Sequence, residues 1–268
     1  MNAECRSVRI DLGYDGTEFF GSQRQRDRRT VQQVVEEVLG RLTNQDVQLS
    51  FAGRTDRGVH AVGQVASGKV FWRRDGESLR FALDSLAPTD VTITGVRWVE
   101  ERFHARFSAV SREYRYRIWT GLPPPILVKR FAWPVRDSLD MAAMRTAARL
   151  LLGEHDFSSF AGAGLGVPWN PIDCARTVFH SEWRLLPIEW ERASSSVQLL
   201  EFEIRANGFL PHMVRNIVGN LFAVGRGLRS VEWFATVLAE QDRRLAEAPA
   251  PPNGLVLWSV NYPERLAG

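Results

Sequence analysis

The sequence is poor in cysteine and has no long apolar run. Cys5 and Cys174 are the only cysteines among 268 residues. Two separated thiols supply neither a disulfide framework nor a zinc site, so we expect a protein of the reducing cytoplasm. No run of about 18 apolar residues occurs, so we expect no membrane span. The first residues lack an apolar segment behind a basic one, so we expect no secretory signal.

Lysine is also scarce, and arginine carries almost all of the positive charge. Lys69 and Lys129 are the only lysines, the formal net charge is +3, and the pI is about 9.2. Arginine suits phosphate binding and base stacking, although a genome-wide preference for arginine would give the same composition. The segment QRQRDRRT at 23–30 is more specific, since so basic a loop is typical of a phosphate contact or of a solvated loop.

What the sequence does contain is an apolar fraction of 44% and a charged fraction of 24%, as in globular proteins. Residue patterns predict strands at 7–16, 47–53, 60–72, 90–99, 109–120, 175–187, 196–208 and 255–262. Helical spacing predicts helices at 30–42, 78–87, 138–153, 211–227 and 231–241.

This order of elements indicates an α+β fold of two similar subdomains. Short turns as well as helices join the strands, so each sheet should be mostly antiparallel and flanked by helices. The rigid GLPPP segment at 121–125 marks a seam, which places the subdomains at 1–120 and 121–268. A central cleft would lie between them.

The segment FAGRTDRGVHA at 51–61 begins as a strand and then breaks into a polar loop. Asp56 lies between Arg54 and Arg57, and Gly53 and Gly58 leave the backbone free to turn. Nearby positive charge keeps a carboxylate ionised, and an ionised aspartate can act as a nucleophile, a general base or a metal ligand. A turn or salt bridge of purely structural role explains the same residues. The metal role is the least favoured, because a cation would lie among arginines.

GRTDRGVHA at 53–61 resembles the signature GRTDxGVHA of the tRNA pseudouridine synthase A family. Further similar blocks follow in the family's order: YDGTEFFGSQRQ at 14–25, FHARFSA at 103–109, YRYRI at 114–118, GEHDFSSF at 153–160 and ANGFLPHMVRNIVG at 206–219. The resemblance therefore extends over nearly the whole chain.

The resemblance implies an isomerase that converts uridine to pseudouridine in tRNA. The targets would be roughly positions 38 to 40 of the anticodon stem-loop, reached by flipping the base out of the stack. The family likeness implies no cofactor and no metal, a homodimer, and tRNA bound in the central cleft. It does not tell whether the aspartate attacks the base or the sugar.

The resemblance also assigns roles to individual residues. Asp56 matches the catalytic aspartate, and Tyr114 matches the tyrosine that stacks on the target uracil. Arg215 matches the basic residue that pairs with the aspartate. Arg54 matches the arginine associated with displacing the flipped base. Tyr114 shares a strand face with Tyr116, so the alternative for Tyr114 is a structural role as an aromatic residue of the core.

RNA contacts are expected at Gln23, Arg24 and Gln25. Ser22 stands where the family commonly has tryptophan, so how this segment packs or binds RNA is left open.

Two other classes of protein remain as alternatives. One is a non-catalytic RNA-binding module, for which a carboxylate at position 56 would bring no gain. The other is a hydrolase with an aspartyl intermediate, which would need a metal or a second carboxylate.

Overall fold

The computed structural model describes residues 5–121, 123–162, 174–188 and 197–267. The chain divides into two compact units: unit 1 comprises Met1–Ser111 with Val256–Gly268, and unit 2 comprises Arg112–Leu255. Each unit combines a mostly antiparallel sheet with helices, which confirms the predicted α+β class. This division differs from a single cut after residue 120, because the last strand pairs with a strand of unit 1.

The sheet of unit 1 has the strand order β4-β1-β3-β10, and β2 pairs with β3. Its strands are β1 (Cys5–Tyr14), β2 (Ser50–Phe51), β3 (His60–Phe71), β4 (Val91–Trp98) and β10 (Leu255–Asn261). β1 is antiparallel to both β3 and β4, whereas β10 is parallel to β3. The chain reaches β3 directly after the polar loop at 53–59, so this strand fixes one end of that loop.

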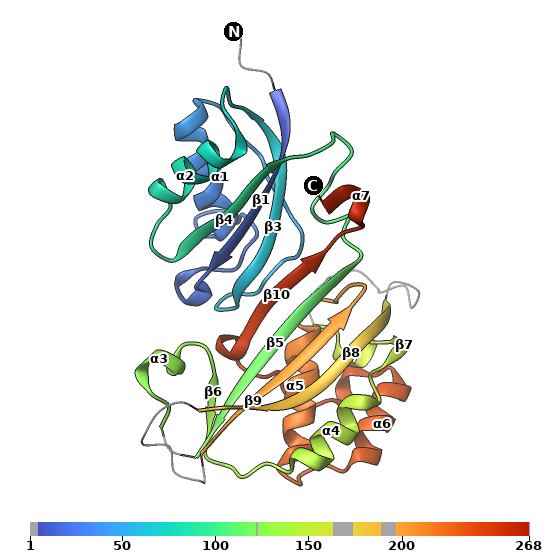
Figure 1. The fold of residues 1–268 in the computed structure, drawn as a ribbon. Coiled ribbons are helices and arrows are strands. Elements are labelled where there is room, and N and C mark those ends of the chain that lie inside the picture. Colours follow the sequence, from blue (N-terminus) through green and yellow to red (C-terminus); the bar gives the residue numbers. More distant parts are fainter. Residues whose placement is uncertain (1–4, 122, 163–173, 189–196, 268) are drawn as a thin grey trace. The chain divides into compact units, whose positions relative to one another are not determined.

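Helices α1 (Val31–Thr43) and α2 (Gly76–Leu86) cover one face of this sheet (Figure 1). Thr30 caps α1 by accepting the Gln33 N–H. Alternate residues of β1 are buried, and Leu39 of α1 and Leu79 of α2 are buried with them. This core supports the strands on either side of the polar loop. A short helix, α7 (Glu264–Ala267), follows β10.

The sheet of unit 2 has the strand order β5-β9-β8-β7, and β6 pairs in parallel with β5. Its strands are β5 (Ser111–Thr120), β6 (Trp133–Val135), β7 (Gly153–Asp156), β8 (Ala175–Leu186) and β9 (Gln198–Ala206). The pairs β5/β9, β8/β9 and β7/β8 are all antiparallel.

One face of the unit 2 sheet is covered by α4 (Met141–Arg149), α5 (Met213–Gly225) and α6 (Val231–Glu240) (Figure 1). α5 starts two residues later than a helix beginning at Pro211, because His212 has a left-handed backbone with φ of 60°. The helix is buried on most sides, which suits its apolar sequence.

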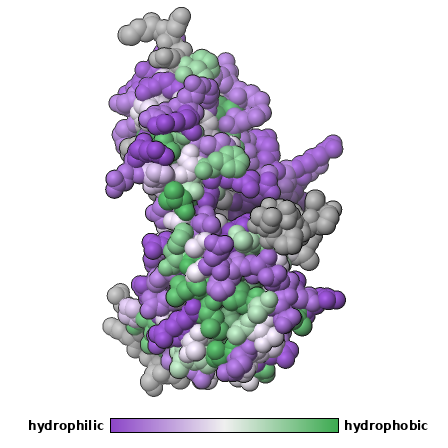
Figure 2. Space-filling view, turned by 90° about the vertical axis from the view of Figure 1, so that its right-hand side faces the viewer, coloured by the Kyte–Doolittle hydropathy of each residue, from purple (hydrophilic) through white to green (hydrophobic). Residues whose placement is uncertain are grey.

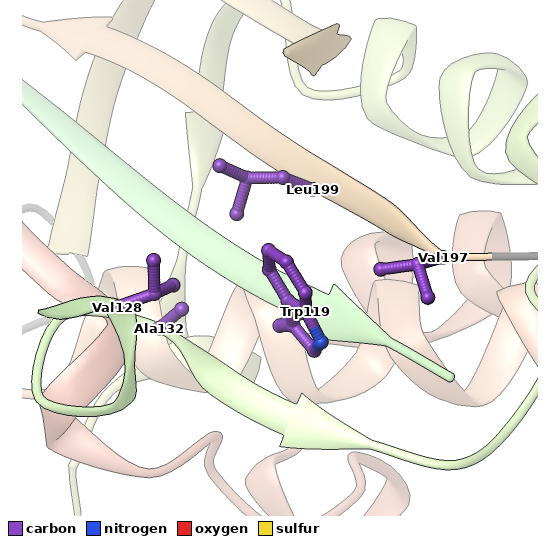
Figure 3. Packing of buried hydrophobic residues seen from close by; sticks show 5 residues of the cluster. All are labelled: Trp119, Val128, Ala132, Val197 and Leu199. Atoms are coloured by element: carbon purple, nitrogen blue, oxygen red, sulfur yellow. The ribbon is translucent and has the colours of Figure 1, made fainter. Parts of the chain in front are cut away.

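An apolar cluster lies around Trp119 of β5, next to α3 (Ile126–Lys129). Val128, Ala132 and Leu199 pack with this indole (Figure 3). Figure 2 shows hydrophobic residues gathered on one face of unit 2, whereas hydrophilic residues predominate over unit 1 in the same view. None of the described helices is both long enough and apolar enough to cross a bilayer.

Candidate active site

The polar loop at 53–59, here called the signature loop, is tied to the neighbouring segment 19–22. The Ser22 N–H donates to the Thr55 carbonyl at 3.1 Å, and the Thr55 N–H donates to Ser22 Oγ at 2.9 Å. The Gly58 N–H donates to the Phe19 carbonyl at 3.4 Å. These bonds lie on both sides of Asp56 in the sequence, so they fix the backbone from which its carboxylate projects.

Two glycines give this loop its shape. The Val59 N–H donates to the Asp56 carbonyl at 3.1 Å, which closes a tight turn, and Gly58 within it has a φ of +78°. Gly21 has a φ of +93°, and a Cβ there would come within 2.7 Å of the Thr55 carbonyl oxygen. Both positions therefore require glycine, one for its backbone conformation and the other also for close approach of two segments.

A buried polar network lies beneath the loop. The Tyr14 hydroxyl and Thr55 Oγ1 are 2.8 Å apart, and Gln64 Nε2 donates to that hydroxyl at 3.3 Å. Gln64 Nε2 also donates to the Gly53 carbonyl at 2.9 Å. Burial raises the pKa of Tyr14 to about 12, so its phenol stays neutral and can donate a hydrogen bond. The network joins β1 and β3 to both ends of the Gly53–Thr55 stretch.

His60 follows the signature loop at the start of β3 and is buried. Its Nδ1 accepts the Gly16 N–H at 3.0 Å and lies 3.1 Å from a carboxylate oxygen of Asp15. This arrangement ties the loop to the YDG turn, and it fits a structural role for the histidine.

The charged residues of the loop differ in exposure. Asp56 is half-buried, whereas Arg54 and Arg57 are exposed. The guanidinium of Arg57 lies over the ring of Phe20, with its Cζ 4.3 Å from the ring centroid. Asp56 and Arg54 therefore lie two residues apart on the signature loop, whose backbone is hydrogen-bonded to segment 19–22.

The three predicted RNA contacts lie in the loop before α1, and all three are exposed. Arg24 Nε donates to Glu36 Oε2 at 2.8 Å, and its side chain is 53% exposed. Gln25 Nε2 donates to the Phe20 carbonyl at 2.7 Å. Arg24 is therefore partly committed to a buried glutamate of α1, and its contact with RNA stays a prediction, as do those of Gln23 and Gln25.

In unit 2, Tyr114 and Tyr116 lie on the side of β5 that faces the core. Tyr114 is 7% exposed and packs edge to face against Phe209, with ring centroids 4.9 Å apart. Tyr116 is fully buried, its hydroxyl donates to the Pro251 carbonyl at 2.8 Å, and burial raises its pKa. Phe209 comes from the ANGFLPH segment, where no local sequence pattern singles it out.

Arg215 lies in the first turn of α5 and is half-buried. Its Nε donates to the Ala250 carbonyl at 2.8 Å, and the Ala250 N–H donates to the Arg215 carbonyl at 2.9 Å. The guanidinium is close enough to Tyr116 to oppose electrostatically the rise in that residue's pKa. Segment 250–251 therefore holds Arg215 and Tyr116 in one neighbourhood of unit 2.

The described residues contain no group of three or more histidine, cysteine, aspartate or glutamate side chains placed to hold a metal ion.

A family model described as tRNA pseudouridine synthase matches residues 13–108 and 147–263. The chain belongs to the tRNA pseudouridine synthase family. It is an isomerase that converts uridine of tRNA to pseudouridine, which confirms the class and the tRNA substrate predicted from the sequence.

Individual relatives cover almost all of the chain. A tRNA pseudouridine synthase A from Aeromonas hydrophila is 41% identical over 263 residues, which are 97% of this chain and 92% of the relative. Proteins with the same description from Chloroflexus aurantiacus and Coxiella burnetii are 42% and 43% identical. They match 97% and 96% of this chain, and 90% and 94% of their own lengths.

Proposed function

We propose that this isomerase acts on uridines at roughly positions 38 to 40 of the tRNA anticodon stem-loop, after flipping each base out of the stack. Asp56 is the nucleophile, Arg54, Tyr114 and Arg215 bind the substrate, and neither a metal nor a cofactor takes part. The observation that carries this proposal is that neighbouring segments hold the backbone of the signature loop in place around Asp56. Three hydrogen bonds and a buried network fix the backbone around one half-buried carboxylate.

The reaction is an isomerisation, so its atoms balance without a co-reactant. The bond between N1 of uracil and C1′ of ribose breaks, and a bond between C5 and C1′ forms. C5 loses its proton, and N1 ends with one. A carboxylate serves this sequence by attacking covalently, either the ribose at C1′ or the uracil ring, and leaving again.

The resemblance and the structure support these roles to different degrees. Asp56 and Arg54 lie on one loop whose conformation is fixed by neighbouring segments. Tyr114 presents an aromatic ring that is nearly buried, and Arg215 is held at the start of α5. A homodimer in the cytoplasm remains part of the proposal, because the family resemblance implies the dimer and cysteine usage implies the compartment.

The test is release of tritium from tRNA labelled at C5 of uridine. Transcripts that keep a single uridine at position 38, 39 or 40 should each release tritium with the wild-type enzyme. A transcript with all three replaced by cytidine should release none above background. Release from a uridine elsewhere in the tRNA, with none from these three, would overturn the assigned target range.

A further inference from the structure

One aromatic ring beside the signature loop carries two cations. Cζ of Arg57 lies 4.3 Å from the centroid of Phe20, and Cζ of Arg28 lies 4.5 Å from it. These distances limit the separation of the two guanidinium carbons to about 9 Å, with the ring as their shared support. Both arginines are exposed, whereas Phe20 is half-buried. We call these three residues the Phe20 clamp.

The backbone holds the clamp in place from both sides. Gln25 and Arg28 form an antiparallel bridge that closes a hairpin, and the Phe20 N–H donates to the Arg29 carbonyl at 2.9 Å. The signature loop, which supplies the other arginine, is bonded to segment 19–22 as described above. The two arginines therefore come from different loops that are fixed to the same short segment.

Other arginines of this region are already paired with carboxylates. Arg24 forms an ion pair with Glu36 at 2.6 Å. Arg29 donates both terminal nitrogens to Asp90, at 2.7 and 2.9 Å. By contrast, in the part of the chain that the structure describes, neither arginine of the Phe20 clamp forms an ion pair with a carboxylate. Within the described residues, the clamp thus holds two guanidinium groups within about 9 Å of each other, and neither forms an ion pair with a carboxylate.

Such an arrangement suits a phosphate group. Stacking on a ring occupies the face of a guanidinium and leaves its N–H edge to donate to phosphate oxygens. An anion between two fixed cations also removes their mutual repulsion. Since Arg57 directly follows Asp56, a phosphate bound here would belong to the RNA backbone close to the reacting nucleotide.

We propose that the Phe20 clamp binds a backbone phosphate of the tRNA substrate beside the uridine that reacts at Asp56. The inference rests on the proposed function, because it takes Asp56 as the reacting group. Arg57 occupies the unspecified position of GRTDxGVHA, so the signature alone does not require the clamp.

The test is the salt dependence of tRNA binding, measured by fluorescence anisotropy over a range of sodium chloride concentrations. The variants are Arg57→Gln, Arg28→Gln and the double substitution. Each single variant should lower the slope of log K against log salt by about 1, and the double variant by about 2. Dissociation constants at low salt should rise about three- to tenfold for each single substitution.

Arg74→Gln is the matched control. Arg74 is exposed and belongs to the same unit, but it follows the far end of β3, a twelve-residue strand that spans about 40 Å. The control should keep the wild-type slope. Arg57→Lys should restore the slope, because it restores the charge, while its dissociation constant stays above that of the wild type because the stacked fork is lost.

A wild-type slope in the double variant would overturn the clamp, provided that its thermal unfolding matches the wild type. The same result in a protein that releases tritium normally would leave the proposed function standing. Absence of tritium release from the wild-type enzyme on every uridine would instead count against the proposed function. The binding slopes and the tritium assay therefore separate the two ideas.

Discussion

Ser22 offers a sharp test of how the signature loop is held. Its hydroxyl accepts the Thr55 N–H at 2.9 Å, and the serine is 0% exposed. Ser22→Ala removes the acceptor and leaves a buried N–H unpaired, which costs about 1 to 3 kcal/mol. The methyl group of alanine fits the same space, so the loss reports the hydrogen bonds of this hydroxyl, to the Thr55 N–H and to Tyr14, and not a change in packing.

Two measurements should register this change. The free energy of unfolding in urea should fall by about 1 to 3 kcal/mol. Amide hydrogen exchange at Thr55 should become about 5-fold to about 140-fold faster, since about 1.4 kcal/mol corresponds to a factor of ten. Turnover should fall as well, because Thr55 directly precedes Asp56, the proposed nucleophile.

Ser85→Ala is the control for the loss of a serine hydroxyl. Ser85 lies on the exposed side of α2 and donates to the Phe81 carbonyl at 2.7 Å, so its loss should change stability by less than about 0.5 kcal/mol. Unchanged stability together with unchanged Thr55 exchange in Ser22→Ala would refute the role assigned to this serine.

Two further perturbations probe the same support. Burial raises the pKa of Tyr14 from 10 in the unfolded chain to about 12 in the folded protein. The folded state therefore keeps this proton more tightly, and the contribution of Tyr14 to the free energy of unfolding is fully present below pH 10 and is lost as the pH rises towards 12. Tyr14→Phe should therefore make the fall in stability over that range shallower by about 2 to 3 kcal/mol in urea titrations, and an unchanged fall would contradict the assigned burial. Gly21→Ala should destabilise the protein by more than about 1 kcal/mol and lower turnover, because its Cβ would meet the Thr55 carbonyl oxygen at 2.7 Å and its φ is +93°. Wild-type thermal stability in this variant would show that the two segments can separate freely.

Local sequence signals predicted the elements of the fold well. Helical spacing at 30–42 predicts α1, and the residue patterns at 7–16 and 109–120 predict β1 and β5. The predicted strand at 47–53 shrinks to Ser50–Phe51, since pairing with β3 is limited to these two residues. Long-range pairing explains a further difference: no local pattern tells that β10 lies next to β3. The short elements α3, β6 and β7 have no counterpart among the predicted elements either.

The signature in the sequence points to the candidate site residues, but it does not show which residues hold the signature loop in place. Thr55, Ser22, Tyr14 and Gln64 lie up to 50 residues apart and meet only in the folded unit. No local sequence pattern distinguishes these four residues from other polar residues. Their hydrogen bonds matter for stability because the side chains are buried in the folded unit. The stacking of two arginines on Phe20 also depends on the folded unit, so the sequence shows only the basic loop.

The central claim is that the carboxylate of Asp56 performs the chemistry. Asp56→Asn keeps the size of the side chain and removes its charge, so tRNA should still bind with a dissociation constant close to that of the wild type. Tritium release in a single turnover, with enzyme in excess over labelled tRNA, measures the reaction directly. We predict no release above background from Asp56→Asn. Release at the wild-type rate from this variant would contradict the account.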